Sequence, residues 1–115
     1  MTFKPRSRVA TESQEPGKLE ILTSYLTDEL IPVLKNLDFD CRLIPNPVEG
    51  GAPFLVAQRH EHEAAFTVLS YGHGDVVRGY AAQWHKGLEP WTLNIQGDRW
   101  YGRGTADNKG QHSIN

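Results

Sequence analysis

The chain has 115 residues, of which 12 are Lys or Arg and 14 are Asp or Glu, so its formal net charge is −2. This balance gives no basic surface for nucleic acid or an anionic membrane, and no apolar run approaches the roughly 18 residues that span a bilayer. We therefore predict a soluble, cytoplasmic protein with no nucleic-acid or membrane partner. The single cysteine, Cys41, excludes an internal disulfide and a zinc finger built on cysteine pairs.

The first part of the chain divides into a leader and a helix. Residues 1–16 are rich in polar side chains and end at Pro16-Gly17, which predicts a flexible leader before one domain over 17–115. Apolar residues then recur at steps of three and four over 19–37, as in an amphipathic helix. Pro32 lies inside this pattern and lacks a backbone N–H, so we expect the helix to kink or split there.

Three strands are predicted in the middle of the chain. Residues 41–44 and 54–58 are short strand candidates, and the segment between them is a loop rich in proline and glycine. Residues 65–71 form a nearly continuous apolar run, which is typical of a strand covered on both faces. This strand would be the most buried element of the chain.

The last part of the sequence predicts a hairpin and the beginning of another helix. The runs 92–96 and 99–101 flank a Gly97-Asp98 turn, and a helix is expected from Asn108 onward. Helices and strands in this order predict the α/β class, as part of a larger mixed sheet. Because a helix that stops after a few residues leaves its apolar face without a partner, we interpret the chain as truncated.

Residues with metal-binding chemistry follow the apolar run directly. His73 lies between two glycines, and Asp75 comes two positions later. Ligands of open α/β sheets gather where strands end, and residues two apart in an extended segment point the same way. A carboxylate behind a ligating imidazole fixes its tautomer and raises its basicity. The other interpretation of a His-x-Asp pair is an ordinary hydrogen bond within a loop.

A second candidate is the glycine-rich segment 101–111. A dinucleotide-binding fingerprint needs glycine where this chain has Asp107, and a phosphate-binding P-loop needs Ser or Thr directly after Gly-Lys, which the segment lacks. Two interpretations are left open. Asp107 is a metal ligand held by a glycine-rich turn at the start of a helix, or the segment is a flexible surface loop.

Taken together, the two segments resemble the M20 metallopeptidase family, which includes acetylornithine deacetylase, succinyl-diaminopimelate desuccinylase and carboxypeptidase G. The resemblance spans about residues 66–111. It is carried by His73-x-Asp75-x-Val77, Trp84, Pro90-Trp91 and Trp100-Tyr101-Gly102-Arg103-Gly104-x-x-Asp107-x-Lys109-Gly110. It implies a zinc-peptidase-like catalytic domain of which this chain is the N-terminal portion.

The resemblance also assigns roles to single residues. It makes His73 a terminal ligand of one zinc ion and Asp107 the carboxylate that bridges two, with cobalt or manganese as other suitable metals. It gives Asp75 a catalytic role as the carboxylate that supports His73, and it implies a cis peptide bond between Asp107 and Asn108. The implied reaction is hydrolysis of an amide bond in an N-acyl amino acid or small peptide, for which paired metals activate water.

The chain departs from the family in what it lacks. A pair of adjacent glutamates, a further acidic ligand, a distant histidine ligand and an inserted lid domain are expected in the family and have no counterpart within 1–115. The lid is often the dimer interface, so a longer parent protein would be a candidate homodimer. Because a catalytic zinc normally has three protein ligands, we expect the 115-residue fragment alone to be inactive.

Two other functions stay open. One is a non-catalytic remnant or interaction module, whose unfinished sheet edge would make it self-associate. The other is a single-metal module built from His73, His85 and Asp75. His112 is interpreted as a surface or loop residue. Arg103 has two interpretations: it orients the metal loop through hydrogen bonds to backbone carbonyls, or it is exposed to solvent.

Overall fold

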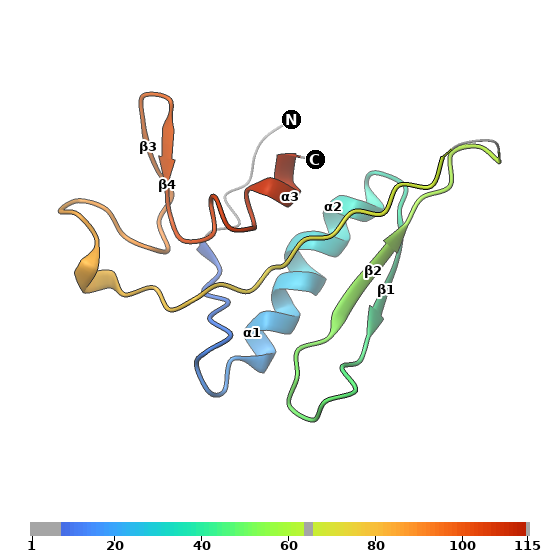
Figure 1. Cartoon of the computed structure of the whole chain (residues 1–115), viewed down its shortest axis with the longest axis horizontal. Helices are drawn as coiled ribbons and strands as arrows, with labels where there is room; N and C mark the ends of the chain where they lie inside the picture. Colours follow the sequence, from blue (N-terminus) through green and yellow to red (C-terminus); the bar gives the residue numbers. More distant parts are fainter. Residues whose placement is uncertain (1–7, 64–65, 115) are drawn as a thin grey trace.

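A helix of three consecutive parts runs through the centre of the molecule, and the computed structural model describes residues 8–63 and 66–114 (Figure 1). The parts are α1 (Leu19–Ser24), the π-helical η2 (Tyr25–Leu30) and α2 (Ile31–Lys35). Pro32 lies in the first turn of α2, where a missing N–H is tolerated. The helix therefore continues through Pro32, and wider π turns precede the proline in place of a split.

The first hairpin lies alongside this helix (Figure 1). Its strands β1 (Asp40–Ile44) and β2 (Phe54–Gln58) are antiparallel, with Arg42 opposite Val56. Both strands predicted from the sequence are thereby confirmed. In the connecting loop the side chain of Asn46 donates to the carbonyl of Ala52 at 2.9 Å, and its Oδ1 accepts from the N–H of Val48 at 2.9 Å.

The apolar run expected to be the most buried strand is extended but has no sheet partner. Residues 66–71 belong to no strand, and Phe66 and Leu69 are 99% and 95% exposed. The prediction of a strand covered on both faces is therefore wrong for this segment, while Ala65 lies outside the described residues. An apolar run forms a buried strand only where neighbouring strands supply hydrogen-bond partners, and the strands of the described residues pair only within the two hairpins.

A second hairpin and two short helical turns make up the C-terminal part. The 3₁₀ turn η3 (Ala81–Gln83) precedes the antiparallel strands β3 (Asn94–Gln96) and β4 (Arg99–Tyr101). Gly97 takes a φ of 62° between these strands, which glycine adopts without a steric cost. The hairpin predicted around Gly97-Asp98 is confirmed, and the expected last helix begins at α3 (Gln111–Ile114).

The most buried side chains of the described residues gather where the N-terminal segment, the helix and the last loop meet. They are Tyr25, Val76, Thr11 and Lys109. Glu12 and Val76 form an isolated parallel bridge, so residues 9–13 lie beside the segment that carries His73. This part of the predicted leader therefore packs against the candidate site.

The fold mixes helices with β-structure, as the sequence indicated. Among residues 8–63 and 66–114 the strands form two separate antiparallel pairs, and no larger sheet joins them. Within the same residues, no helix has the length and apolar character needed to cross a membrane.

Candidate metal centre

Two segments that are distant in sequence meet at the candidate site. Residues 72–76 approach from the extended run, and residues 102–110 form a tight loop after β4. The N–H of Gly110 donates to the carbonyl of Gly104 at 3.1 Å, and the hydroxyl of Thr105 donates to the carbonyl of Gly102 at 2.8 Å. Gly104 has a φ of 82°, a backbone conformation that disfavours other residues. These bonds close the loop so that Asp107 lies at its tip.

The central contact of the site joins His73 and Asp107. The Nε2 atom of His73 lies 3.0 Å from Oδ1 of Asp107, and the two side chains are 34% and 86% exposed. Both sequence-predicted metal ligands are thus brought together, with the carboxylate open to solvent and the imidazole more enclosed. Zinc binds imidazole nitrogen at about 2.0–2.1 Å and carboxylate oxygen at about 2.0–2.2 Å, so one ion can contact both atoms.

Asp75 lies on the other side of the same imidazole. Nδ1 of His73 is 3.1 Å from the carboxylate of Asp75 and 3.1 Å from its backbone carbonyl. Because both neighbours are acceptors, Nδ1 carries the hydrogen and donates it. Nε2 faces the carboxylate of Asp107 in the same way, so the metal-free ring is suited to carry a proton on each nitrogen. A metal ion at Nε2 would replace the proton there and leave the Nδ1 hydrogen bonded to Asp75, which is the tautomer that such a ligand requires.

The surroundings of His73 also favour its protonated form when no metal is bound. Burial by itself lowers the pKa of His73, but the hydrogen bonds to Asp75 and Asp107 and the charges of both carboxylates outweigh that effect, so the pKa is raised above 6.5. A proton on Nε2 then satisfies Asp107. The position that a metal would take between these atoms is thus one that already attracts positive charge.

Asn108 fastens the two segments to each other, a role that the sequence analysis did not identify. Its Oδ1 accepts the backbone N–H of His73 at 3.0 Å and lies 3.2 Å from Nδ1 of His112. The peptide bond between Asp107 and Asn108 is cis, as the family resemblance implies. The side chain after the proposed bridging ligand therefore holds the backbone of the other ligand.

Tyr25 and His112 extend this network to the central helix. The hydroxyl of Tyr25 lies 2.8 Å from Nε2 of His112. The interpretation of His112 as a surface or loop residue is incomplete, because its ring contacts both Tyr25 and Asn108. Tyr25 directly precedes Leu26, a residue of the apolar helix face. Nothing in the sequence therefore marked its hydroxyl as a partner of His112.

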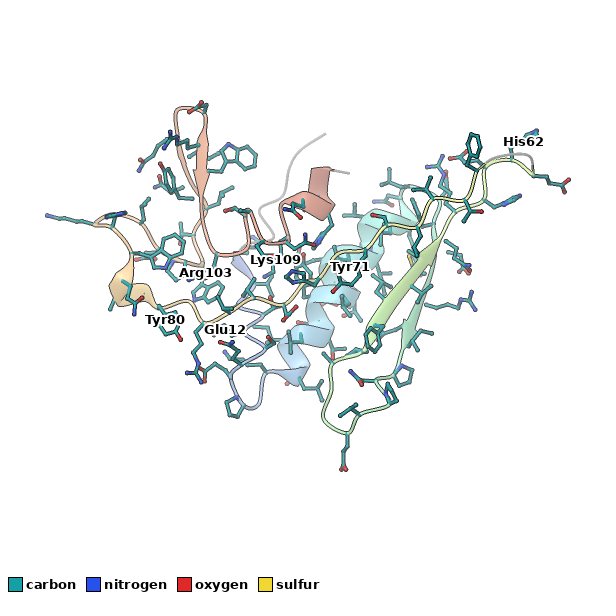
Figure 2. All side chains as sticks on the ribbon, viewed as in Figure 1. Glu12, His62, Tyr71, Tyr80, Arg103 and Lys109 are labelled. Atoms are coloured by element: carbon teal, nitrogen blue, oxygen red, sulfur yellow. The ribbon has the colours of Figure 1, made fainter. Side chains whose placement is uncertain are left out.

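Lys109 is buried close to the central helix (Figure 2). The Nζ atom of Lys109 donates to the carbonyl of Val9 at 2.6 Å and lies 4.7 Å from the centre of the Tyr25 ring. Burial lowers the pKa of Lys109 to about 8, although the charges of Asp75 and Glu29 oppose this. The lysine thus links the Asp107 loop to the N-terminal segment.

Arg103, in the same loop, bonds the loop to the segment of Gly79 and Trp84. Its Nη2 donates to the carbonyl of Gly79 at 3.2 Å, and its guanidinium lies 5.5 Å from the ring centre of Trp84. Nε1 of Trp84 donates to the same carbonyl at 2.8 Å. Of the two interpretations of Arg103, the structure agrees with the one in which it donates to a backbone carbonyl.

The described residues bring together two candidate metal ligands rather than a complete set. Within 8–63 and 66–114, no group of three or more His, Cys, Asp or Glu side chains is arranged to hold a metal ion. The single-metal module of His73, His85 and Asp75 is therefore wrong, since His85 does not join the other two. Asp75 faces the nitrogen that is directed away from Asp107, so it supports the ligand and does not add to the ligand count.

Comparisons of the sequence with models of protein families and with curated proteins find no match.

Proposed function

We propose that His73 and Asp107 are ligands of a divalent-metal site, with zinc as the first choice, in an amide-cleaving hydrolase of the M20 type. The observation that carries this proposal is the 3.0 Å approach of Nε2 of His73 to Oδ1 of Asp107 across 34 positions of sequence. An imidazole whose other nitrogen is held by a carboxylate is the common form of a histidine metal ligand in proteins. The substrate class is an N-acyl amino acid or a small peptide.

Asp107 has the accessibility that a bridging ligand requires. Its side chain is 86% exposed, and only Oδ1 faces His73. The other oxygen is directed elsewhere and is available to a second metal ion. Paired metals about 3.5–4 Å apart activate water and polarise an amide carbonyl. A zinc-peptidase-like domain with this pair at its centre is part of the same proposal.

The proposal requires ligands beyond those described. A catalytic zinc normally takes three protein ligands, and His73 and Asp107 supply two among the described residues. Further acidic and histidine ligands would have to come from additional protein. The 115-residue chain alone should therefore bind zinc weakly and cleave no substrate.

The test is the hydrolysis of an N-acetyl amino acid or a dipeptide by the protein as its cells make it, supplied with Zn²⁺. We expect Asp107→Asn to abolish turnover, because an amide is a poor bridging ligand. His85→Ala is the control, since that imidazole lies outside the site, and it should leave turnover unchanged. Hydrolysis that survives Asp107→Asn would contradict the proposal.

A second candidate function is an interaction module, and one observation favours it. The side chains of residues 66–71 include Phe66, Val68, Leu69 and Tyr71, each at least 84% exposed. Contiguous exposed apolar side chains mark contact surfaces, and an extended segment with unpaired backbone groups accepts another strand. Concentration-dependent association that Leu69→Asp removes would support this function, whereas a monomer at all concentrations would exclude it.

A further inference from the structure

The N-terminal segment 9–13 is joined to the segment of His73 by a short parallel ladder. The N–H of Val76 donates to the carbonyl of Thr11 at 2.9 Å, and the N–H of Ser13 donates to the carbonyl of Val76 at 3.2 Å. The hydroxyl of Thr11, which is fully buried, donates to the carbonyl of Gly74 at 2.5 Å. These bonds fix the position of Ser13 relative to Asp75.

Ser13 uses that position to bond to the carboxylate behind His73. Its hydroxyl donates to Oδ2 of Asp75 at 2.8 Å, while Oδ1 of the same carboxylate accepts from Nδ1 of His73 at 3.1 Å. Each carboxylate oxygen therefore has its own partner. A carboxylate bonded at one oxygen can rotate about its side-chain torsions, whereas one bonded at both oxygens has its plane fixed.

We propose that Ser13 is a positioning residue of the metal centre, which orients Asp75 and, through it, the imidazole of His73. This inference deepens the proposed function and rests on it. Ser13 touches neither of the two ligands, so its effect passes through the Asp75 carboxylate alone. Without the hydroxyl, the Asp75 carboxylate is free to turn from Nδ1, so that the backbone carbonyl of Asp75 is the one acceptor that still faces this nitrogen. The Nδ1–H form of the ring is then held less firmly, and Nε2 is less often the unprotonated nitrogen.

The same segment also reaches the second ligand's loop. Nζ of Lys109 donates to the carbonyl of Val9 at 2.6 Å, four residues before Ser13. At the other end of the segment, the carboxylate of Glu12 accepts the N–H of Gly79 at 2.8 Å. Residues 9–13 are therefore bonded to both ligand-bearing segments, which places Ser13 on a fixed support.

The experiment compares Ser13→Val with Ser13→Thr, because threonine and valine have the same shape and differ in the hydroxyl. The first readout is the tautomer of His73, taken from the ring ¹⁵N chemical shifts of the metal-free chain at a pH where the imidazole is neutral. The second is the affinity for Zn²⁺. Thr27→Val is the matched control, because the Thr27 hydroxyl bonds to the carboxylate of Asp28 at 2.8 Å on the exposed helix surface.

We expect Ser13→Val to lower the fraction of the Nδ1–H tautomer and to weaken zinc binding about threefold to tenfold. That loss lies below the roughly 10- to 100-fold typical of removing a direct hydrogen-bond partner of a ligand. Ser13→Thr should match the wild type in both readouts, and Thr27→Val should change neither.

Equal tautomer fractions in Ser13→Val and Ser13→Thr would overturn the inference, because the hydroxyl would then have no effect on His73. If the wild-type chain does not bind zinc even weakly, the pairing of His73 and Asp107 on one metal ion fails, yet the tautomer comparison still decides the role of Ser13. If the wild type binds zinc and the two variants bind it equally, the positioning role is overturned and the metal site stands.

Discussion

Nε2 of His73 and Oδ1 of Asp107 approach to 3.0 Å, although 34 positions of sequence separate the two residues. Each atom is the metal-binding atom of its side chain, and each residue is held by a separate set of hydrogen bonds. Asp75 orients the imidazole, and Asn108 ties the backbone of His73 to the loop of Asp107. Hydrogen bonds therefore hold the two potential ligands close to each other, and variants of these residues test the arrangement.

The first prediction concerns the protonation of His73. Its pKa should lie above 6.5, because the hydrogen bonds and charges of Asp75 and Asp107 outweigh the effect of burial. The raised pKa means that this residue's contribution to stability is present below pH 6.5 and is lost as the pH rises through the folded-state pKa. Titration of the ring proton resonances by NMR measures it. Asp107→Asn should lower the pKa of His73, and Asp98→Asn, a remote carboxylate, should not.

The second prediction concerns Lys109, whose pKa is lowered to about 8 from 10.5. The unfolded chain binds a proton between these values that the folded chain does not, so stability should rise with pH from about 8 to 10.5. The full effect is up to about 3 kcal/mol. Urea unfolding of the wild type and of Lys109→Met across this pH range measures the contribution of Lys109. All other groups titrate in both proteins, so the difference between the two stability curves comes from the lysine. Parallel stability curves would show that the lysine is not buried as described.

The third prediction concerns the close approach of Gly74 to Tyr25. A methyl group at Gly74 would overlap the ring of Tyr25, so one of the two must move. We expect Gly74→Ala to destabilise the chain by about 1–3 kcal/mol, as is typical of overpacking. In a double-mutant cycle with Tyr25→Ala, the double variant should lose less than the sum of the single losses. Additive losses would place the ring away from Gly74.

The fourth prediction concerns the exposed apolar run. Leu69 is 95% exposed, so Leu69→Ser should change the free energy of unfolding by less than about 0.5 kcal/mol. If the segment were the buried strand that its sequence indicates, removing the side chain would cost about 2–5 kcal/mol. Denaturant unfolding of both proteins distinguishes these outcomes. A large loss would show that the sequence pattern describes this segment better than its extended, exposed form.

Local patterns in the sequence predicted the elements that depend on nearby residues. The strands around Arg42 and Val56 and the hairpin around Gly97 are set by alternation and turn chemistry within a few residues. The burial of 66–71 could not be judged in this way, since it depends on which strands lie beside the segment. An apolar segment favours burial, but whether it is buried depends on which other elements of the fold pack against it.

The candidate site was predictable only in part, because some of its contacts join residues that are far apart in sequence. His73, Asp75 and Asp107 were identified by residue type and by their order along the chain. Tyr25 and Ser13 were not, because a tyrosine in a helix and a serine in a polar segment carry no mark of a distant partner. Their hydrogen bonds to His112 and Asp75 span 87 and 62 positions, and only the tertiary arrangement reveals them.

The measurement that tests the central claim most directly is a Zn²⁺ titration of the chain, followed by the ¹⁵N resonances of its histidine rings. We predict that zinc shifts Nε2 of His73 while Nδ1 keeps its hydrogen, and that Asp107→Asn strongly weakens this response. Zinc shifts confined to the other histidines, or a His73 response that Asp107→Asn leaves unchanged, would contradict the claim that His73 and Asp107 share a metal ion.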